Sequence, residues 1–64
     1  METYNKNMFS NYPDVVNVAE LQEMLGIGRN KAYSLLQQGV IKSRKIGTIY
    51  KIPKINIIKF LEEV

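Results

Sequence analysis

Three residues, Gly26, Ile27 and Gly28, separate two short segments that both have helical periodicity. The apolar residues of the first segment are Val18, Leu21, Met24 and Leu25, and those of the second are Ala32, Leu35 and Leu36. Both sets recur three or four residues apart, as on one face of a helix. Because glycine readily takes the left-handed conformation that ends a helix, Gly26 and Gly39 predict where the two helices stop. The spacing predicts two helices joined by a turn of three or four residues.

The residues before the first helix carry a start signal. Asn17 and Glu20 are spaced as in a capping box, in which each side chain bonds the backbone N–H of the other residue. Val16 and Leu21 occupy the positions of a hydrophobic staple around this cap. We therefore expect the first helix to begin at about Val18, after a very short strand at Val15 and Val16.

The second half of the chain has a different pattern. Residues 41–46 and 49–52 are rich in β-branched side chains and are separated by Gly47 and Thr48, which predicts a hairpin. Pro53 has the position of a first helical residue. The apolar residues Ile57, Phe60, Leu61 and Val64 predict a last amphipathic helix. The predicted fold is α+β, a small winged helix-turn-helix with the order β-α-α-β-β-α, in which the hairpin is the wing.

The charges are strongly segregated along the chain. No acidic residue lies between Glu23 and Glu62, although the formal net charge is only +3. Eight of the nine basic residues lie in this interval: Arg29, Lys31, Lys42, Arg44, Lys45, Lys51, Lys54 and Lys59. Because a duplex carries one phosphate charge about every 1.7 Å of its axis, a cationic surface without acids is typical of a nucleic-acid binder.

The composition argues against several other classes of protein. The 64 residues include no Cys and no His, which excludes disulfides, zinc fingers and a histidine base, and the carboxylates are too dispersed for a paired acid and base. We therefore expect a non-enzyme without cofactor, metal or small-molecule substrate. No apolar run approaches the roughly 18 residues that span a bilayer, and the N-terminus does not resemble a signal peptide. These features predict a cytoplasmic protein that does not bind membranes.

The stretch from Asp14 to Leu61 resembles the excisionase-type winged helix domains related to the mercury-regulator superfamily. The similar features are Leu25-Gly26-Ile27, Ala32-Tyr33, Gly39-Val40-Ile41, Ile46-Gly47, Tyr50-Lys51-Ile52-Pro53 and Phe60-Leu61. The resemblance implies that the second helix enters the major groove and that the wing meets the DNA backbone or minor groove. It also implies an accessory protein of a mobile element, an excisionase or recombination directionality factor that bends DNA and directs a tyrosine integrase toward excision.

From the resemblance and the helical wheel we select candidate DNA-binding residues. In the second helix they are Arg29, Asn30, Lys31, Tyr33, Ser34 and Gln37. In the wing they are Arg44, Lys45, Thr48 and Lys51. Asn is suited to a bidentate contact with adenine, and Arg to a guanine edge or a phosphate. The alternative for the helix residues is an ordinary solvated face, and for the wing cations protection of an exposed strand edge.

Two further interpretations concern the ends of the chain. Residues 1–13 are expected to form a flexible arm before a domain of residues 14–64, although Phe9 and Tyr12 could instead pack on the domain. On the last helix, Ile55, Ile58 and Glu62 are candidates for contact with a neighbouring copy or with integrase.

Two alternative functions remain open. One is a small transcriptional regulator of the same fold, and the other is a protein-interaction module that does not bind DNA.

Overall fold

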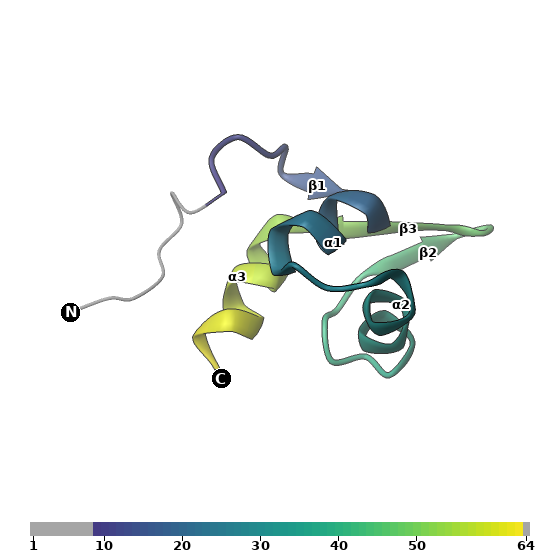
Figure 1. The fold of residues 1–64 in the computed structure, drawn as a ribbon. Helices are drawn as coiled ribbons and strands as arrows, with labels where there is room; N and C mark the ends of the chain where they lie inside the picture. Colours follow the sequence, from purple (N-terminus) through teal and green to yellow (C-terminus); the bar gives the residue numbers. More distant parts are fainter. Residues whose placement is uncertain (1–8, 64) are drawn as a thin grey trace.

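The computed structural model describes residues 9–63 of the chain and is shown in Figure 1. Its elements are β1 (Val15–Val16), α1 (Val18–Leu25), α2 (Arg29–Gln37), β2 (Arg44–Ile46), β3 (Ile49–Pro53) and α3 (Lys54–Glu62). The helix α1 packs on α2, and α3 packs against β3. This order, β-α-α-β-β-α, confirms the predicted small winged helix-turn-helix fold. The hairpin of β2 and β3 extends past α2, and its tip lies at the end of the domain opposite α3 (Figure 1).

The predicted capping box is present at the start of α1. The Glu20 N–H donates to Asn17 Oδ1 at 2.7 Å, and the Asn17 N–H donates to Glu20 Oε1 at 2.9 Å. Val16 and Leu21 both lie in the buried core, as the staple requires. The local sequence therefore fixes both the first residue of α1 and the direction in which the chain enters it.

Hydrogen bonds of the Schellman type end α2. The N–H of Gly39 donates to the Leu36 carbonyl at 3.2 Å, and the N–H of Val40 donates to the Leu35 carbonyl at 3.0 Å. This arrangement needs a left-handed residue after the cap, and Gly39 has a φ of 76°. The turn redirects the chain so that Ile41, which is 1% exposed, enters the core.

The three strands form one antiparallel sheet in the order β1-β3-β2. The register pairs Ile46 with Ile49 on either side of the turn. Gly47 has a φ of 63°, whereas Thr48 does not have a positive φ, the pattern of a type II′ turn. This turn suits the right-handed twist of a hairpin, and it confirms the hairpin predicted around Gly47 and Thr48.

Residues from every element except β2, together with the loop residue Ile41, form the core. Its buried members are Val16, Leu21, Ala32, Leu36, Ile41, Tyr50, Ile52, Ile57 and Ile58. No polar or charged side chain within residues 9–63 is buried. Along β1 and β3, buried core residues alternate with exposed residues, so one face of the sheet is buried and the other is open to solvent.

Two predicted boundaries are wrong by a few residues. Pro53 is the last residue of β3, paired with Val15, and α3 begins at Lys54. Pro53 has an extended ψ of 127°, because its pairing with β1 continues the sheet up to the helix. The first strand of the hairpin begins at Arg44 rather than at Ile41. Ile41 turns into the core instead, and the Asn56 side chain donates to the Lys42 carbonyl at 3.0 Å, which holds the intervening loop.

The expected exposure of Ile58 is also wrong, because this side chain is 2% exposed. Ile57 is buried and Leu61 half-buried as predicted, whereas Val64 lies outside the described residues. The core-facing side of α3 therefore carries the buried Ile57 and Ile58 together with the half-buried Lys54 and Leu61. Ile58 is thus a core residue and does not form a surface strip with Ile55.

Residues 9–12 form a turn that is attached to the domain, and we call this segment the N-terminal strap. Phe9 and Tyr12 pack against the core, and their rings meet edge to face at 6.0 Å. The Lys54 Nζ donates to the carbonyls of Phe9 at 3.2 Å and Tyr12 at 3.0 Å. The two aromatics therefore pack on the domain, as in the alternative interpretation, while residues 1–8 of the expected arm lie outside the described residues.

The strap is also bonded to α1. The Tyr12 hydroxyl donates to Glu23 Oε1 at 3.2 Å. Partial burial raises the pKa of this hydroxyl above its ordinary value, as do the hydrogen bond to Glu23 and the nearby charges of Glu23 and Glu20. The Tyr12 hydroxyl therefore keeps its proton, and with it the hydrogen bond to Glu23, to a higher pH than an ordinary tyrosine would.

We expect Asn17→Ala to lower the free energy of unfolding by about 1 kcal/mol, because it removes the side-chain half of the capping box. Urea denaturation measures this change. The control is Asn11→Ala, which alters an exposed asparagine outside any helix and should change stability by less than about 0.5 kcal/mol. Equal losses in the two variants would show that the cap contributes nothing specific.

A second prediction concerns Lys54. Lys54→Met should lower stability by about 1 to 2 kcal/mol, since it removes two hydrogen bonds from a charged, half-buried donor while keeping most of the aliphatic stem. Hydrogen exchange of the Tyr12 N–H, which donates to the Phe9 carbonyl, should accelerate. Lys59→Met, on the exposed side of the same helix, is the control. Unchanged exchange at Tyr12 in Lys54→Met would contradict the role of this lysine.

Candidate nucleic-acid interface

The outer face of α2 presents most of the predicted helix residues to solvent. Arg29, Asn30, Lys31 and Gln37 are exposed, whereas Ala32 and Leu36 are buried on the opposite side. Gly28 is the N-cap residue of this helix, and it makes no side-chain cap bond. The buried residues fix the rotation of α2 about its axis, so the polar residues project away from the domain.

Ser34 is engaged within the same helix face. The Gln38 Nε2 donates to Ser34 Oγ at 3.0 Å, which links two side chains one turn apart. Ser34 is half-buried and Gln38 is exposed. The pair adds an amide and a hydroxyl to the polar surface formed by Asn30 and Gln37.

Four side chains connect α2 to the hairpin, and we call this arrangement the cation–aromatic ladder. The Arg29 guanidinium lies 5.4 Å from the centre of the Tyr33 ring. The Tyr33 and Tyr50 rings meet edge to face at 5.8 Å, with an interplanar angle of 65°. The Lys45 Nζ lies 5.5 Å from the centre of the Tyr50 ring. Each contact lies within the range of a favourable aromatic or cation–π interaction.

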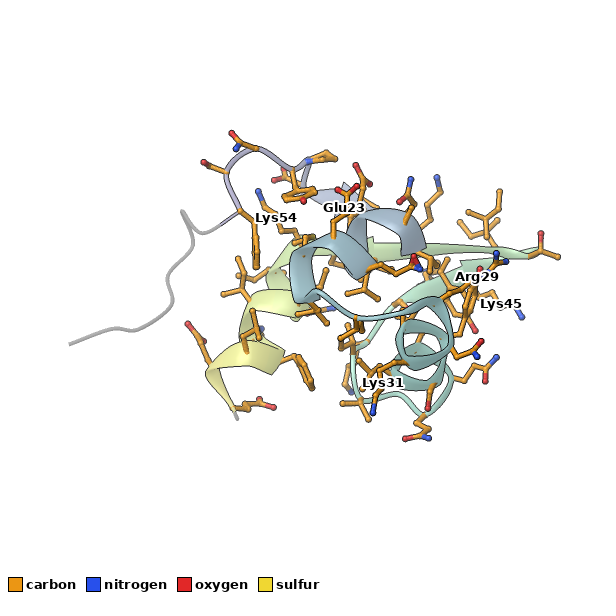
Figure 2. The ribbon with its side chains drawn as sticks, viewed as in Figure 1. Glu23, Arg29, Lys31, Lys45 and Lys54 are labelled. Atoms are coloured by element: carbon orange, nitrogen blue, oxygen red, sulfur yellow. The ribbon has the colours of Figure 1, made fainter. Side chains whose placement is uncertain are left out.

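The ladder holds the charge at the start of α2 close to a charge of the wing. Figure 2 shows Arg29 and Lys45 near each other where α2 meets the hairpin. Tyr50 is buried and Tyr33 half-buried, so both rings are fixed by packing. The two exposed cations therefore each lie over a ring that is held by packing.

The predicted wing residues lie on both faces of the hairpin. Arg44 pairs directly with Lys51, and both are exposed on the open face of the sheet. Lys45 pairs with Tyr50 on the other face. Thr48 lies in the turn at the tip and is exposed. The wing cations therefore flank the hairpin on both sides.

Other basic residues of the acid-free interval belong elsewhere. The Lys54 head group is engaged by the N-terminal strap, and Figure 2 places it at the end of the domain away from Arg29 and Lys45. Lys42 and Lys59 line a shallow hollow with Val40 and Phe60, between α3 and the loop that follows α2. None of these three is among the DNA-binding residues predicted from the sequence.

Sequence reasoning missed Tyr50 as a member of the site. The signal was present, because a two-residue turn at Gly47 and Thr48 places residues 45 and 50 opposite each other. An aromatic residue directly across from a lysine is a favourable cross-strand pair. The contact with Tyr33 could not be inferred in this way, since it depends on how α2 packs on the sheet.

No three acidic side chains among residues 9–63 are grouped so that they could hold a metal ion. None of the helices formed by these residues is long and apolar enough to cross a membrane.

Comparison with known proteins agrees with this geometry. The model of the helix-turn-helix domain family matches residues 15–64, which is all of the chain except its first 14 residues. No curated protein and no solved structure gives a significant match. A helix-turn-helix domain suggests DNA binding, and such domains are typically not enzymes. Since both the match and the element order cover nearly the whole chain, this protein belongs to the helix-turn-helix domain family.

Proposed function

We propose that this protein binds duplex DNA with sequence preference, through α2 in the major groove and through the hairpin on the neighbouring backbone or minor groove. The observation that carries the proposal is the cation–aromatic ladder, which joins a cation of α2 to a cation of the wing. Two cations fixed on adjacent elements suit a rigid polyanion, because little side-chain freedom is lost when they meet phosphates.

The exposed residues divide into two kinds in this proposal. Asn30 and Gln37 carry amides that can pair with a base edge, and Ser34 can contact either base or phosphate. Arg29, with its guanidinium held over Tyr33, suits a guanine edge or a phosphate near the start of the helix. Lys31, Arg44, Lys45, Lys51 and Thr48 are assigned to the backbone, which fixes register without reading sequence.

At a finer level, we propose an excisionase of a mobile element that bends the DNA at the element ends and directs a tyrosine integrase. The resemblance of residues 14–61 to excisionase-type domains supports this function. Ile55, 44% exposed on α3, supports it further, because α3 lies at the end of the domain opposite the hairpin tip and would be free on bound DNA. Ile55 and the exposed Glu62 are the proposed contacts with integrase or a neighbouring copy.

An excision assay separates this function from a transcriptional regulator. The protein is added to a tyrosine integrase and element-end DNA, and footprints are recorded with and without the integrase. An excisionase stimulates excision and extends the footprint cooperatively. Ile55→Ser should remove the cooperativity and leave single-site binding intact. Binding to an operator with no effect on excision would favour a regulator, and absence of any footprint would favour a protein-interaction module.

The first quantitative prediction is the salt dependence of duplex binding. If roughly five phosphates are neutralised, the log of the binding constant should fall against log salt with a slope of about −4 to −5. Fluorescence anisotropy with a labelled duplex at increasing salt gives this slope. A flat dependence would remove DNA binding as the function.

The second prediction separates base reading from backbone contact. Asn30→Ala should lose discrimination worth about 1 to 3 kcal/mol at one base position, because a bidentate contact to that base is removed. Lys51→Ala should weaken binding to all sequences about equally and make the salt slope shallower by about 1 unit. Selection from a pool of random duplexes, followed by affinity measurements on single-base variants, tests both. Uniform weakening by both changes would refute the assignment of Asn30.

A further inference from the structure

The tip of the hairpin is apolar as well as cationic. Ile46 is 57% exposed and Ile49 is 55% exposed, the highest exposures among the large hydrophobic side chains of residues 9–63. They are directly paired across the strands, with only Gly47 and Thr48 between them. Because paired residues of an antiparallel hairpin project to the same face, the two side chains form one apolar surface at the tip.

We propose that Ile46 and Ile49 form a wedge that enters the minor groove of duplex DNA and partly separates two stacked base pairs. Apolar side chains inserted between base steps kink a duplex by about 20° to 90°. This inference rests on the proposed DNA-binding function and adds to it a second mode of contact, made by residues that carry no charge and no hydrogen-bonding group.

The residues next to the tip indicate the chemistry of the partner. Arg44 and Lys51 follow the isoleucines on the same face, two residues along each strand, and are directly paired with each other. Like charges placed directly opposite each other destabilise a hairpin. An anionic partner removes this cost, and no acidic residue of the hairpin does so.

The arrangement fits a duplex in particular. The stacked bases are apolar and lie between two rows of phosphate, so an apolar tip bordered by cations matches them in both respects. A protein groove with an acidic rim could offer similar chemistry. The duplex is favoured because the same hairpin carries Lys45 on its opposite face. The cation–aromatic ladder links Lys45 to Arg29 of α2, the helix that we propose lies in the major groove.

The dimensions of the tip explain why a kink would follow. Strands of a sheet lie about 4.8 Å apart, whereas the minor groove is about 6 Å wide. The backbone of a two-residue turn can enter such a groove, but the added width of two isoleucine side chains requires the groove to open. Opening is easiest at pyrimidine–purine steps, which unstack readily, so the wedge should prefer TA or CA steps.

The experiment uses the full chain and a duplex selected from the random pool. Adenines at the TA or CA step where the wedge is expected to enter are replaced by 2-aminopurine, whose fluorescence rises when it unstacks. Dyes at the two ends of the duplex report bending. The test variant is Ile46→Thr with Ile49→Thr, which retains β-branched side chains suited to a strand. Val15→Thr is the matched control, because Val15 is 50% exposed on the open face of the sheet but lies in β1, away from the tip.

Wild type and Val15→Thr should bend the duplex and raise the fluorescence, and the double threonine variant should lose both effects while keeping the salt slope of wild type. A variant carrying leucine at both positions should restore them, because it restores apolar volume. A urea midpoint equal to that of wild type verifies that the double threonine variant is folded.

Four results would overturn the wedge, and they differ in what else they exclude. Bending and unstacking that persist in the double threonine variant would show that the isoleucines are not responsible. Wild-type binding with the predicted salt slope but without unstacking would exclude the wedge and leave the proposed function standing, whereas no salt-dependent binding would exclude both. Finally, loss of assembly between copies with unchanged bending would make the tip a protein contact.

Discussion

The edge-to-face contact between Tyr33 and Tyr50 connects the two halves of this small domain. Tyr33 belongs to α2 and Tyr50 to β3, and the second ring is buried where the sheet meets the helices. The contact joins the hairpin to α2, and a cation lies over each of the two rings. The same packing that stabilises the fold therefore also fixes Arg29 and Lys45. In a 64-residue chain with a minimal core, such dual use of side chains is economical.

Net charge describes this protein poorly, whereas the distribution of charge describes it well. Two acids that precede the basic interval have local partners: Glu20 completes the capping box of α1, and Glu23 accepts from the Tyr12 hydroxyl. Lys54 is held by the strap carbonyls. The surface formed by α2 and the hairpin is left with cations and neutral polar groups, to which the hairpin tip adds an apolar pair. Such a surface combines electrostatic attraction with the means to distort a stacked duplex.

Features that depend on neighbouring residues could be predicted from the sequence, whereas features that depend on residues distant in the chain could not. The cap at Asn17, the end of α2 near Gly39 and the turn at Gly47 were predicted correctly, because each depends on a few neighbouring residues. The start of α3 was wrong by one residue, since the pairing of Pro53 with β1 extends the sheet. The exposure of Ile58 was wrong because the chain before β1 reaches that side of α3, where Asp14 and Ile58 line the same pocket. For the candidate interface, the sequence identified the polar residues of α2 and the cations of the wing but not the ladder that joins them.

By itself, the sequence determined the elements, their order and the segregation of charge, because periodicity, caps and turns are local properties of the chain. Only the tertiary structure decided which cations belong together. Arg29 and Lys45 are 16 positions apart and are joined through two aromatic rings, whereas Lys54 is turned toward a strap more than 40 positions earlier in the chain. The physical reason is that packing in three dimensions brings rings and carbonyls to these lysines and arginines, and no periodicity along the chain encodes those distances.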